Sequence, residues 1–180
     1  VRVWDGALTE AQLRFIMNQE IEADGSQVKG KIVPIYISKN DINSESWASL
    51  EGYFPMNLFA YTNVKDESDN GLIAAIRNLD TVDNQTAPLP YISENDGSWG
   101  SATTWPNGSD GMAIPGTTAL ADSGTTVDWN IVRTSHNVTK SVNTTVLALQ
   151  VLANEFTVDN DSKLEITHYL RLDGTIDLVG

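Results

Sequence analysis

The chain has 180 residues, enough for one large or two small domains that bury an apolar core. Its 11 lysines and arginines stand against 24 aspartates and glutamates, and the net charge of −13 repels phosphate backbones and anionic lipid, which argues against nucleic-acid binding. The absence of cysteine excludes disulfides, iron–sulfur clusters and thiolate zinc sites.

Two further features bear on where such a chain works. No apolar run approaches the roughly 18 residues that a membrane helix needs, so we expect no direct membrane insertion. Small secreted eukaryotic domains usually carry disulfides. An extracellular protein without cysteine is therefore more typical of a bacterial cell surface.

Residues 1–25 predict a strand, a turn and a helix. Thr9 is the predicted N-cap, and Gln12, three residues later, completes a capping box. We expect the helix to run to about Ala23 and to stop at Gly25. Its predicted apolar stripe consists of Leu13, Ile16, Met17 and Ile21.

The next part of the chain, 26–92, predicts short strands joined by polar loops. The segment 32–37 is rich in β-formers, but its proline confines it to a sheet edge or a bulge. Turn-forming residues dominate 63–71, and a strand is expected within 72–79. Two prolines keep 86–91 extended, which is typical of a linker.

From Ser93 onward the composition shifts toward Gly, Ser, Thr and Asn, and short alternating apolar segments follow one another between turns. This spacing predicts a parallel β-solenoid or a β-sandwich. The stretch from Val146 to Gly180 folds into two or three coils of roughly twenty residues, where about three stacked repeats are needed for stability. The segments are Val127/Trp129/Ile131, Val146/Leu147/Leu149/Val151, Phe156/Val158, Leu164/Ile166, Leu170/Leu172 and Ile176/Leu178.

The two ends of the sequence also carry an expectation. Val1 and Val3 start the chain inside an alternating pattern, without Met or a signal peptide, and Gly180 directly follows a strand-like segment. We expect the chain to be a segment of a longer protein.

The run Val1-Arg2-Val3-Trp4 followed by Ala7-Leu8-Thr9 resembles the end of laminin-G-like, concanavalin-type jelly-roll domains. The segments 52–56, 86–91 and 97–108, and His136-Asn137-Val138-Thr139 before repeated short strands, resemble the connecting regions of very large Bacteroidota surface proteins. The resemblance implies a mostly β chain in three parts. These are a jelly-roll tail with one short helix (1–25), a β-rich connecting region (26–92), and the start of a right-handed parallel β-helix or β-sandwich repeat domain (93–180).

This resemblance also implies a function and a location. Such proteins leave the cell by the type IX secretion route and act in adhesion or gliding, held at the outer membrane through the parent protein. The expected partners are surface glycans, other cell-surface proteins and type IX secretion components. Asp80-Thr81-Val82 resembles the pattern on which these bacteria attach O-glycans, which makes Thr81 a candidate glycosylation site.

The sequence gives little support for catalysis. His136 is adjacent to Ser135, and neighbouring residues in a strand point to opposite faces, so they cannot form a nucleophile–base pair. His168 lies in an alternating segment on the expected outer face. Arg171, Asp173 and Asp177 could be assigned to polysaccharide chemistry only along a longer solenoid cleft. We predict no catalytic residues and no enzyme.

Calcium is the one metal that the residue types favour. Asp66, Asp69 and Asn70 offer hard oxygen ligands, as do the turn residues 159–161. Neither set matches an EF-hand loop, and Asx turns have the same composition without a metal. Calcium is therefore a possible rather than a required ligand, and no other cofactor is expected.

Carbohydrate binding is the third possibility. Trp99 and Trp105 lie in a loop rich in Gly, Ser and Thr, with Asn107 close by, and aromatic faces beside amides are what sugar rings stack on. The alternative, which we favour, is that these tryptophans cover the apolar end of the β-region that follows.

The function that the sequence favours is that of a segment of a secreted cell-surface adhesin or structural surface protein. Two alternatives remain open. One is a carbohydrate-binding module of a secreted polysaccharide-degrading enzyme, and the other is a cargo segment bound to a type IX secretion translocon.

Overall fold

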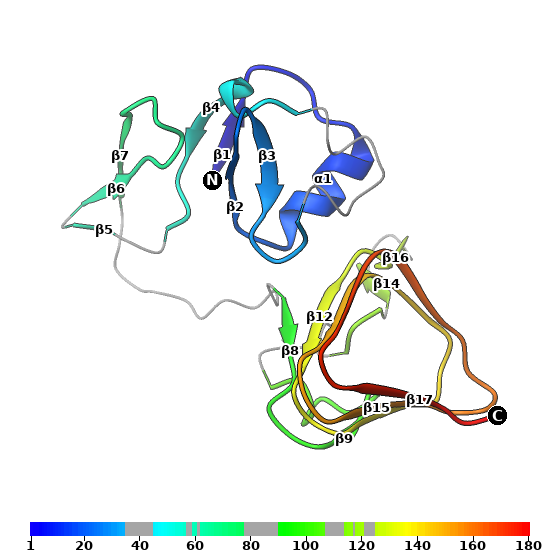
Figure 1. Ribbon diagram of the computed structural model, residues 1–180. Coiled ribbons are helices and arrows are strands. Elements are labelled where there is room, and N and C mark those ends of the chain that lie inside the picture. Colours follow the sequence, from blue (N-terminus) through cyan, green and yellow to red (C-terminus); the bar gives the residue numbers. More distant parts are fainter. Residues whose placement is uncertain are drawn as a thin grey trace. The chain divides into compact units, whose positions relative to one another are not determined.

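The computed structural model describes residues 1–34, 45–56, 59–60, 62–77, 90–106, 114–116, 118–120 and 125–180. The chain forms two compact units, Val1–Asn84 (unit 1) and Gln85–Gly180 (unit 2). Strands dominate the described residues and α-helix is limited to one short segment, so the predicted mostly β fold is confirmed (Figure 1). No helix in this part of the chain is both long and apolar enough to cross a membrane.

The described residues of unit 1 form a helix and small antiparallel sheets. Strand β1 pairs with β4, β2 forms a hairpin with β3, and β6 lies between β5 and β7. A 3-10 helix covers Trp47–Ser49. The elements are β1 (Arg2–Trp4), α1 (Glu10–Met17), β2 (Ile21–Asp24), β3 (Gln27–Gly30), β4 (Leu50–Tyr53), β5 (Phe59–Ala60), β6 (Asn63–Lys65) and β7 (Ile73–Ala75).

The start of helix α1 is as predicted, but its end is not. The Thr9 hydroxyl accepts a hydrogen bond from the Gln12 backbone N–H at 3.2 Å, and the Gln12 side chain accepts from the Thr9 N–H at 2.8 Å, which makes a complete capping box. The predicted extension to Ala23 is wrong, because α1 ends at Met17 and β2 begins at Ile21. Gly25, with a φ of 62°, forms the β2–β3 turn instead of stopping a helix.

The buried face of α1 also differs from the predicted stripe. Phe15 and Ile16 are buried, whereas Leu13 is 51 % exposed and Met17 is 43 % exposed. The helix therefore buries a different face from the predicted one. Ile21 remains in the core of unit 1, where it is contributed by β2.

Unit 2 is built around two four-stranded parallel sheets, which together are called the parallel stack below. The strand order is β16-β14-β12-β8 in one sheet and β17-β15-β13-β9 in the other, so consecutive strands along the chain alternate between the sheets. A separate antiparallel pair joins β10 and β11. The strands are β8 (Tyr91–Ile92), β9 (Gly97–Ser98), β10 (Thr118–Leu120), β11 (Thr125–Thr126), β12 (Ile131–Thr134), β13 (Val138–Lys140), β14 (Thr144–Val151), β15 (Glu155–Val158), β16 (Leu164–Leu172) and β17 (Thr175–Leu178).

In the parallel stack, apolar side chains of the inner face lie above one another on successive strands. Val138 lies opposite Phe156, and Phe156 lies opposite Ile176, so the inner face of this sheet continues from strand to strand. Tyr91 pairs with Val132, so the stack includes residues that precede Ser93. Figure 1 shows β12, β14 and β16 side by side, with β9, β15 and β17 forming another wall.

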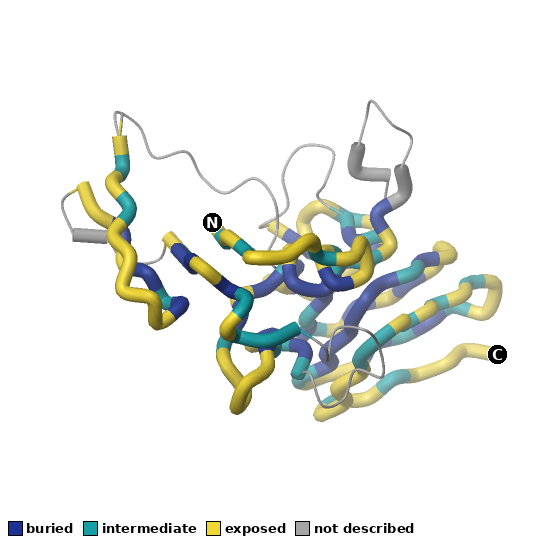
Figure 2. Tube along the Cα trace, turned by 90° about the horizontal axis from the view of Figure 1, so that it is seen from above, coloured by how far each residue is buried: buried dark blue, intermediate teal, exposed yellow. Residues whose placement is uncertain are grey.

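The core of unit 2 lies between these two walls. Its buried members are Tyr91, Trp99, Trp105, Val132, Val138, Val146, Leu149, Val151, Phe156 and Val158. Burial falls off along the stack: Figure 2 shows dark blue on the inner strands and mainly yellow and teal toward the C-terminus. The last strands, β16 and β17, therefore leave part of their apolar surface exposed.

The turns between strands are stacked as closely as the strands. The Thr175 backbone N–H donates to the Asn154 carbonyl oxygen at 2.9 Å, which links the β16–β17 turn to the β14–β15 turn. A Cβ atom on Gly174 would lie 2.5 Å from the same carbonyl oxygen. Glycine at this position is therefore needed for the close approach of the two turns.

Candidate functional site

The two tryptophans predicted to bind sugar lie together inside the parallel stack. Trp99 and Trp105 are both 0 % exposed, and their rings meet edge-to-face with centroids 5.3 Å apart. Trp99 also makes an edge-to-face contact with Phe156 at 5.7 Å, and Trp105 makes one with Tyr91 at 6.4 Å. The two indoles thus form an aromatic cluster in the core.

The polar edge of each indole is satisfied by backbone. Trp99 Nε1 donates to the Pro115 carbonyl oxygen at 3.0 Å, and Trp105 Nε1 donates to the Trp99 carbonyl oxygen at 2.9 Å. Burial of both rings leaves no face open for a sugar ring in this structure. The arrangement instead has the features expected of a core that closes one end of the stack.

Two polar residues just before the tryptophans, Asn95 and Asp96, make hydrogen bonds within the protein. Asn95 Nδ2 donates to the Thr103 carbonyl oxygen at 2.9 Å. Asp96 accepts from the Asn137 backbone N–H at 2.9 Å and from its side chain at 3.2 Å, and these bonds lower the pKa of the Asp96 carboxyl. Asn107 lies outside the described residues, as does the candidate glycosylation site Thr81.

The predicted calcium ligands Asp66, Asp69 and Asn70 lie in one loop of unit 1, and each side chain makes at least one hydrogen bond within the protein. Asn70 Nδ2 donates to the carbonyl oxygens of Leu50 and Glu51, both at 3.0 Å. Asp69 accepts from the Trp47 indole N–H at 3.3 Å.

Asp66 is the centre of this loop. Its carboxylate accepts hydrogen bonds from the backbone N–H groups of Tyr53 at 2.8 Å, Ser68 at 3.0 Å and Leu72 at 3.1 Å. The Ser68 hydroxyl donates to it at 2.8 Å. Burial of Asp66 on its own would raise its pKa, but the hydrogen bonds to the charged form outweigh this effect and lower the pKa to about 2. The carboxylate thus joins β4 to the loop after β6.

A metal centre is not assembled within the described ranges. No group of three or more histidine, aspartate or glutamate side chains there is placed to hold an ion. In the second predicted calcium segment, 159–161, the Asp159 backbone N–H donates to the Lys140 carbonyl oxygen at 2.9 Å. Calcium binding at Asp66, Asp69 and Asn70 remains a prediction.

His136 has a hydroxyl partner that the sequence did not reveal. Its Nδ1 lies 2.9 Å from the Ser93 hydroxyl oxygen, although the two residues are far apart in the chain. The Ser93 hydroxyl is buried and donates to the Thr134 hydroxyl at 2.9 Å, while the Ser135 backbone N–H donates to it at 3.2 Å. Ser93 directly follows β8 and Thr134 is the last residue of β12, so this contact ties the ends of adjacent strands.

Lys140 is a second residue whose position was not anticipated. The side chains of Val138 and Lys140 point to the inner face of β13, and Thr139 between them points outward. Lys140 is 0 % exposed. Its ammonium donates to the Lys163 carbonyl oxygen at 2.8 Å and to the Val142 carbonyl oxygen. Burial lowers the pKa of the amine. The apolar stem fills the core while the head satisfies carbonyls of two turns.

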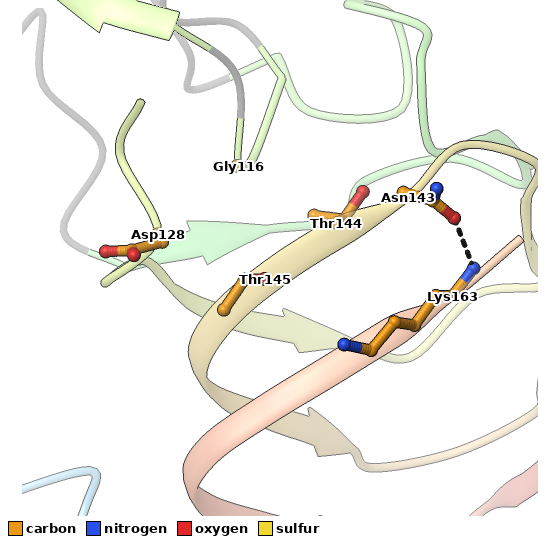
Figure 3. A pocket seen from close by; sticks show the side chains of 6 residues that line it. All are labelled: Gly116, Asp128, Asn143, Thr144, Thr145 and Lys163. Carbon is orange, nitrogen blue, oxygen red and sulfur yellow. Dashed lines mark hydrogen bonds between the residues drawn. The ribbon is translucent and has the colours of Figure 1, made fainter. Parts of the chain in front are cut away.

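A hollow of about 300 Å³ lies in the described part of unit 2 (Figure 3). It contains one carboxylate, Asp128, and one ammonium, Lys163, at its lining. The Lys163 backbone N–H donates to Asn143 Oδ1 at 2.7 Å, which ties two turns together, and the ammonium of Lys163 pairs with Glu165 at 2.7 Å. Neither contact forms a nucleophile–base pair. The lining residues are Gly116, Asp128, Asn143, Thr144, Thr145 and Lys163.

Comparisons with known proteins give no match: no family model, curated protein or solved structure matches this chain.

Replacement of Trp99 by alanine separates the two roles considered for the tryptophans. Because the ring is fully buried, we expect Trp99→Ala to destabilise unit 2 by about 3–5 kcal/mol in denaturant unfolding, and Trp99→Phe by clearly less. Glycan retention on a polysaccharide column provides the second readout. Loss of retention by a variant with wild-type stability would contradict the core assignment.

The low pKa of Asp66 predicts a pH dependence of unit 1. Since the folded pKa is about 2 and the unfolded value about 3.9, the carboxylate stabilises unit 1 fully above the unfolded pKa, and this stabilisation is lost as pH falls toward 2. Asp66→Ala should cost about 1–3 kcal/mol at neutral pH, because buried N–H donors lose their acceptor. The backbone amide signals of Tyr53 and Ser68 in NMR spectra report on this unit.

Asp69→Asn is the matched control, because the Asp69 side chain is in the same loop but accepts an exposed hydrogen bond from the Trp47 indole N–H. We expect this variant to keep the acid-induced transition of the wild type. An unchanged transition in Asp66→Ala would show that another group is responsible.

Proposed function

We propose that this chain is a segment of a secreted cell-surface adhesin or structural surface protein. In this proposal the parallel stack is the beginning of a right-handed parallel β-helix, and the first 25 residues close a laminin-G-like jelly roll. The parent protein would use the type IX route of Bacteroidota and would carry the segment on the outer membrane. The observation that carries the proposal is the pair of parallel sheets whose strands alternate along the chain.

This arrangement suits a mechanical and display role. Each turn of the chain adds one strand to each wall, so a stack of turns grows as a rod with the same side-chain rows repeated along it. The rod is stabilised by backbone pairing and a buried core, and it has no disulfide because the sequence has no cysteine. Such a rod holds its surface in a fixed geometry outside the cell.

The outer face of the β9–β13–β15–β17 sheet offers a regular polar row. Ser98 lies opposite Thr139, Thr139 opposite Thr157, and Thr157 opposite Asp177. Neighbouring strands are about 4.8 Å apart, so four short oxygen-bearing side chains repeat at that spacing. Hydroxyl and carboxylate groups in a row can hydrogen-bond to the hydroxyls of a glycan or to polar groups of another surface protein.

The proposal is tested by the binding of the labelled chain to intact bacterial cells and to their isolated surface polysaccharide. A Thr139→Lys/Thr157→Lys variant should weaken this binding by about tenfold or more, because two bulky side chains interrupt the row. Its thermal stability should stay close to that of the wild type, since Thr139 is exposed and Thr157 half-buried.

Ser141→Lys provides the matched control, because Ser141 is exposed but lies in a turn outside the row. It should bind as the wild type does. A wild-type chain that binds neither cells nor polysaccharide would contradict the adhesin proposal. Equal binding by the row variant and the control would exclude this face as the contact surface.

A further inference from the structure

Three segments in the described part of unit 2 have the pattern Asn-x-Ser/Thr, and they begin at Asn137, Asn143 and Asn160. Each of these asparagines is exposed and lies in a turn between strands of the parallel stack. The pattern combines an amide nitrogen that can receive a sugar with a hydroxyl two residues later that the transferring enzyme requires. A folded chain is a good acceptor only where neither group is already used within the protein.

The first segment has its acceptor amide engaged on both sides. Asn137 Nδ2 donates to the Asp96 carboxylate at 3.2 Å, and Asn137 Oδ1 accepts from the Glu155 backbone N–H at 3.3 Å. The bond to the carboxylate is charge-assisted and therefore stronger than a neutral one. A sugar could reach this nitrogen only after these contacts were broken.

The third segment has its hydroxyl engaged instead. The Asn160 side chain is exposed, but the Ser162 hydroxyl is half-buried. This hydroxyl donates to the carbonyl oxygens of Lys140 at 3.1 Å and Asp159 at 3.0 Å. The group that an enzyme would need to recognise is thus turned toward the backbone.

Asn143 and Thr145 keep both groups of the pattern available. The Lys163 backbone N–H donates to Asn143 Oδ1 at 2.7 Å, and because an N–H donates only to the oxygen of the amide, this bond turns Nδ2 to the opposite side (Figure 3). Within the described ranges, neither Asn143 Nδ2 nor the Thr145 hydroxyl makes a hydrogen bond. Asn143 is exposed and Thr145 is half-buried.

The surroundings of Asn143 leave room for a sugar ring. Asn143 and Thr145 both line the hollow of about 300 Å³, where Asp128 supplies an acceptor and Lys163 a donor for sugar hydroxyls. Asn143 precedes β14, and the following turn already lies against it through Lys163. Its exposure is therefore independent of where the sequence ends.

We propose that Asn143 is an N-glycosylation site, with the first sugar lying over this hollow. The donor is a sugar carried on a diphosphate. Asn143 Nδ2 attacks the anomeric carbon, a carbon–nitrogen bond forms, and the carbon–oxygen bond to the diphosphate breaks with its electron pair leaving on the diphosphate. One amide proton passes to a basic group of the transferring enzyme. This modification goes beyond the proposed adhesin role and does not depend on it.

The folded chain is tested with two enzymes, each chosen because it modifies a free peptide of residues 141–147. One is an oligosaccharyltransferase with a lipid-linked diphosphate sugar, and the other is a soluble N-glycosyltransferase with a nucleotide diphosphate sugar. Peptide mapping by mass spectrometry should show occupancy of Asn143 in at least one arm, and that arm identifies the donor. Occupancy of Asn137 and Asn160 should be lower by about tenfold, because their segments must first break hydrogen bonds.

Variants separate the acceptor pattern from general accessibility. Thr145→Val keeps the shape of the side chain but removes the hydroxyl, and it should abolish occupancy of Asn143. Asp96→Ala releases Asn137 Nδ2 and should raise occupancy of Asn137 several-fold without changing that of Asn143. Asn160→Gln is the matched control and should leave Asn143 occupancy as in the wild type. Circular dichroism checks that each variant is folded.

Two outcomes would overturn the proposal. A folded chain that stays unmodified at Asn143 in both arms would show that the turn before β14 is not an acceptor. Equal occupancy of Asn137, Asn143 and Asn160 would show that the hydrogen bonds of the turns do not select among the three segments.

Discussion

The parallel pairing of successive strands around a shared core is the constraint on which unit 2 depends. Phe156 lies between Val138 and Ile176 on neighbouring strands, and its ring packs against the buried indole of Trp99. Apolar side chains can be buried in this way only while the strands stay in register, because a slip by one residue turns each of them outward. The stacked turns and the glycine at 174 follow from the same requirement, since the turns must be as close together as the strands.

Much of this architecture was predictable from local patterns, and the exceptions have physical causes. In the predicted alternating segment Val127/Trp129/Ile131, Val127 and Trp129 precede β12 and lie outside a strand. The capping box at Thr9 and the alternating segments of β14 to β17 were predicted correctly, because both signals lie within a few neighbouring residues. The end of the first helix was not, because the hairpin of β2 and β3 depends on pairing between Ile21 and Gly30 and thus on tertiary contacts. The contact of Ser93 with His136 arises only when β8 and β12 lie side by side.

Charged side chains in the interior also link separate segments of the chain. Asp66 and Lys140 are buried charged residues, and each links separate segments by hydrogen bonds to their backbone groups. The sequence identified the Asp66 carboxylate as a candidate metal ligand but did not show which groups it would contact. Carboxylate oxygens bind metal ions and accept hydrogen bonds from backbone N–H groups equally well. The sequence did not predict that the Lys140 side chain would point into the core. Its burial is tolerated because the long apolar stem packs there. The tryptophan pair is buried in the core of unit 2, and this burial depends on strands that are distant in sequence.

The direction of strand pairing is the most direct test of the parallel stack. In NMR spectra, interstrand NOEs should connect Val138 with Phe156 and Lys140 with Val158, so that partner numbers rise together along both strands. The same relation should hold between β15 and β17, with Phe156 close to Ile176 and Val158 close to Leu178. NOEs whose partner numbers run in opposite directions would indicate an antiparallel sandwich and contradict the stack.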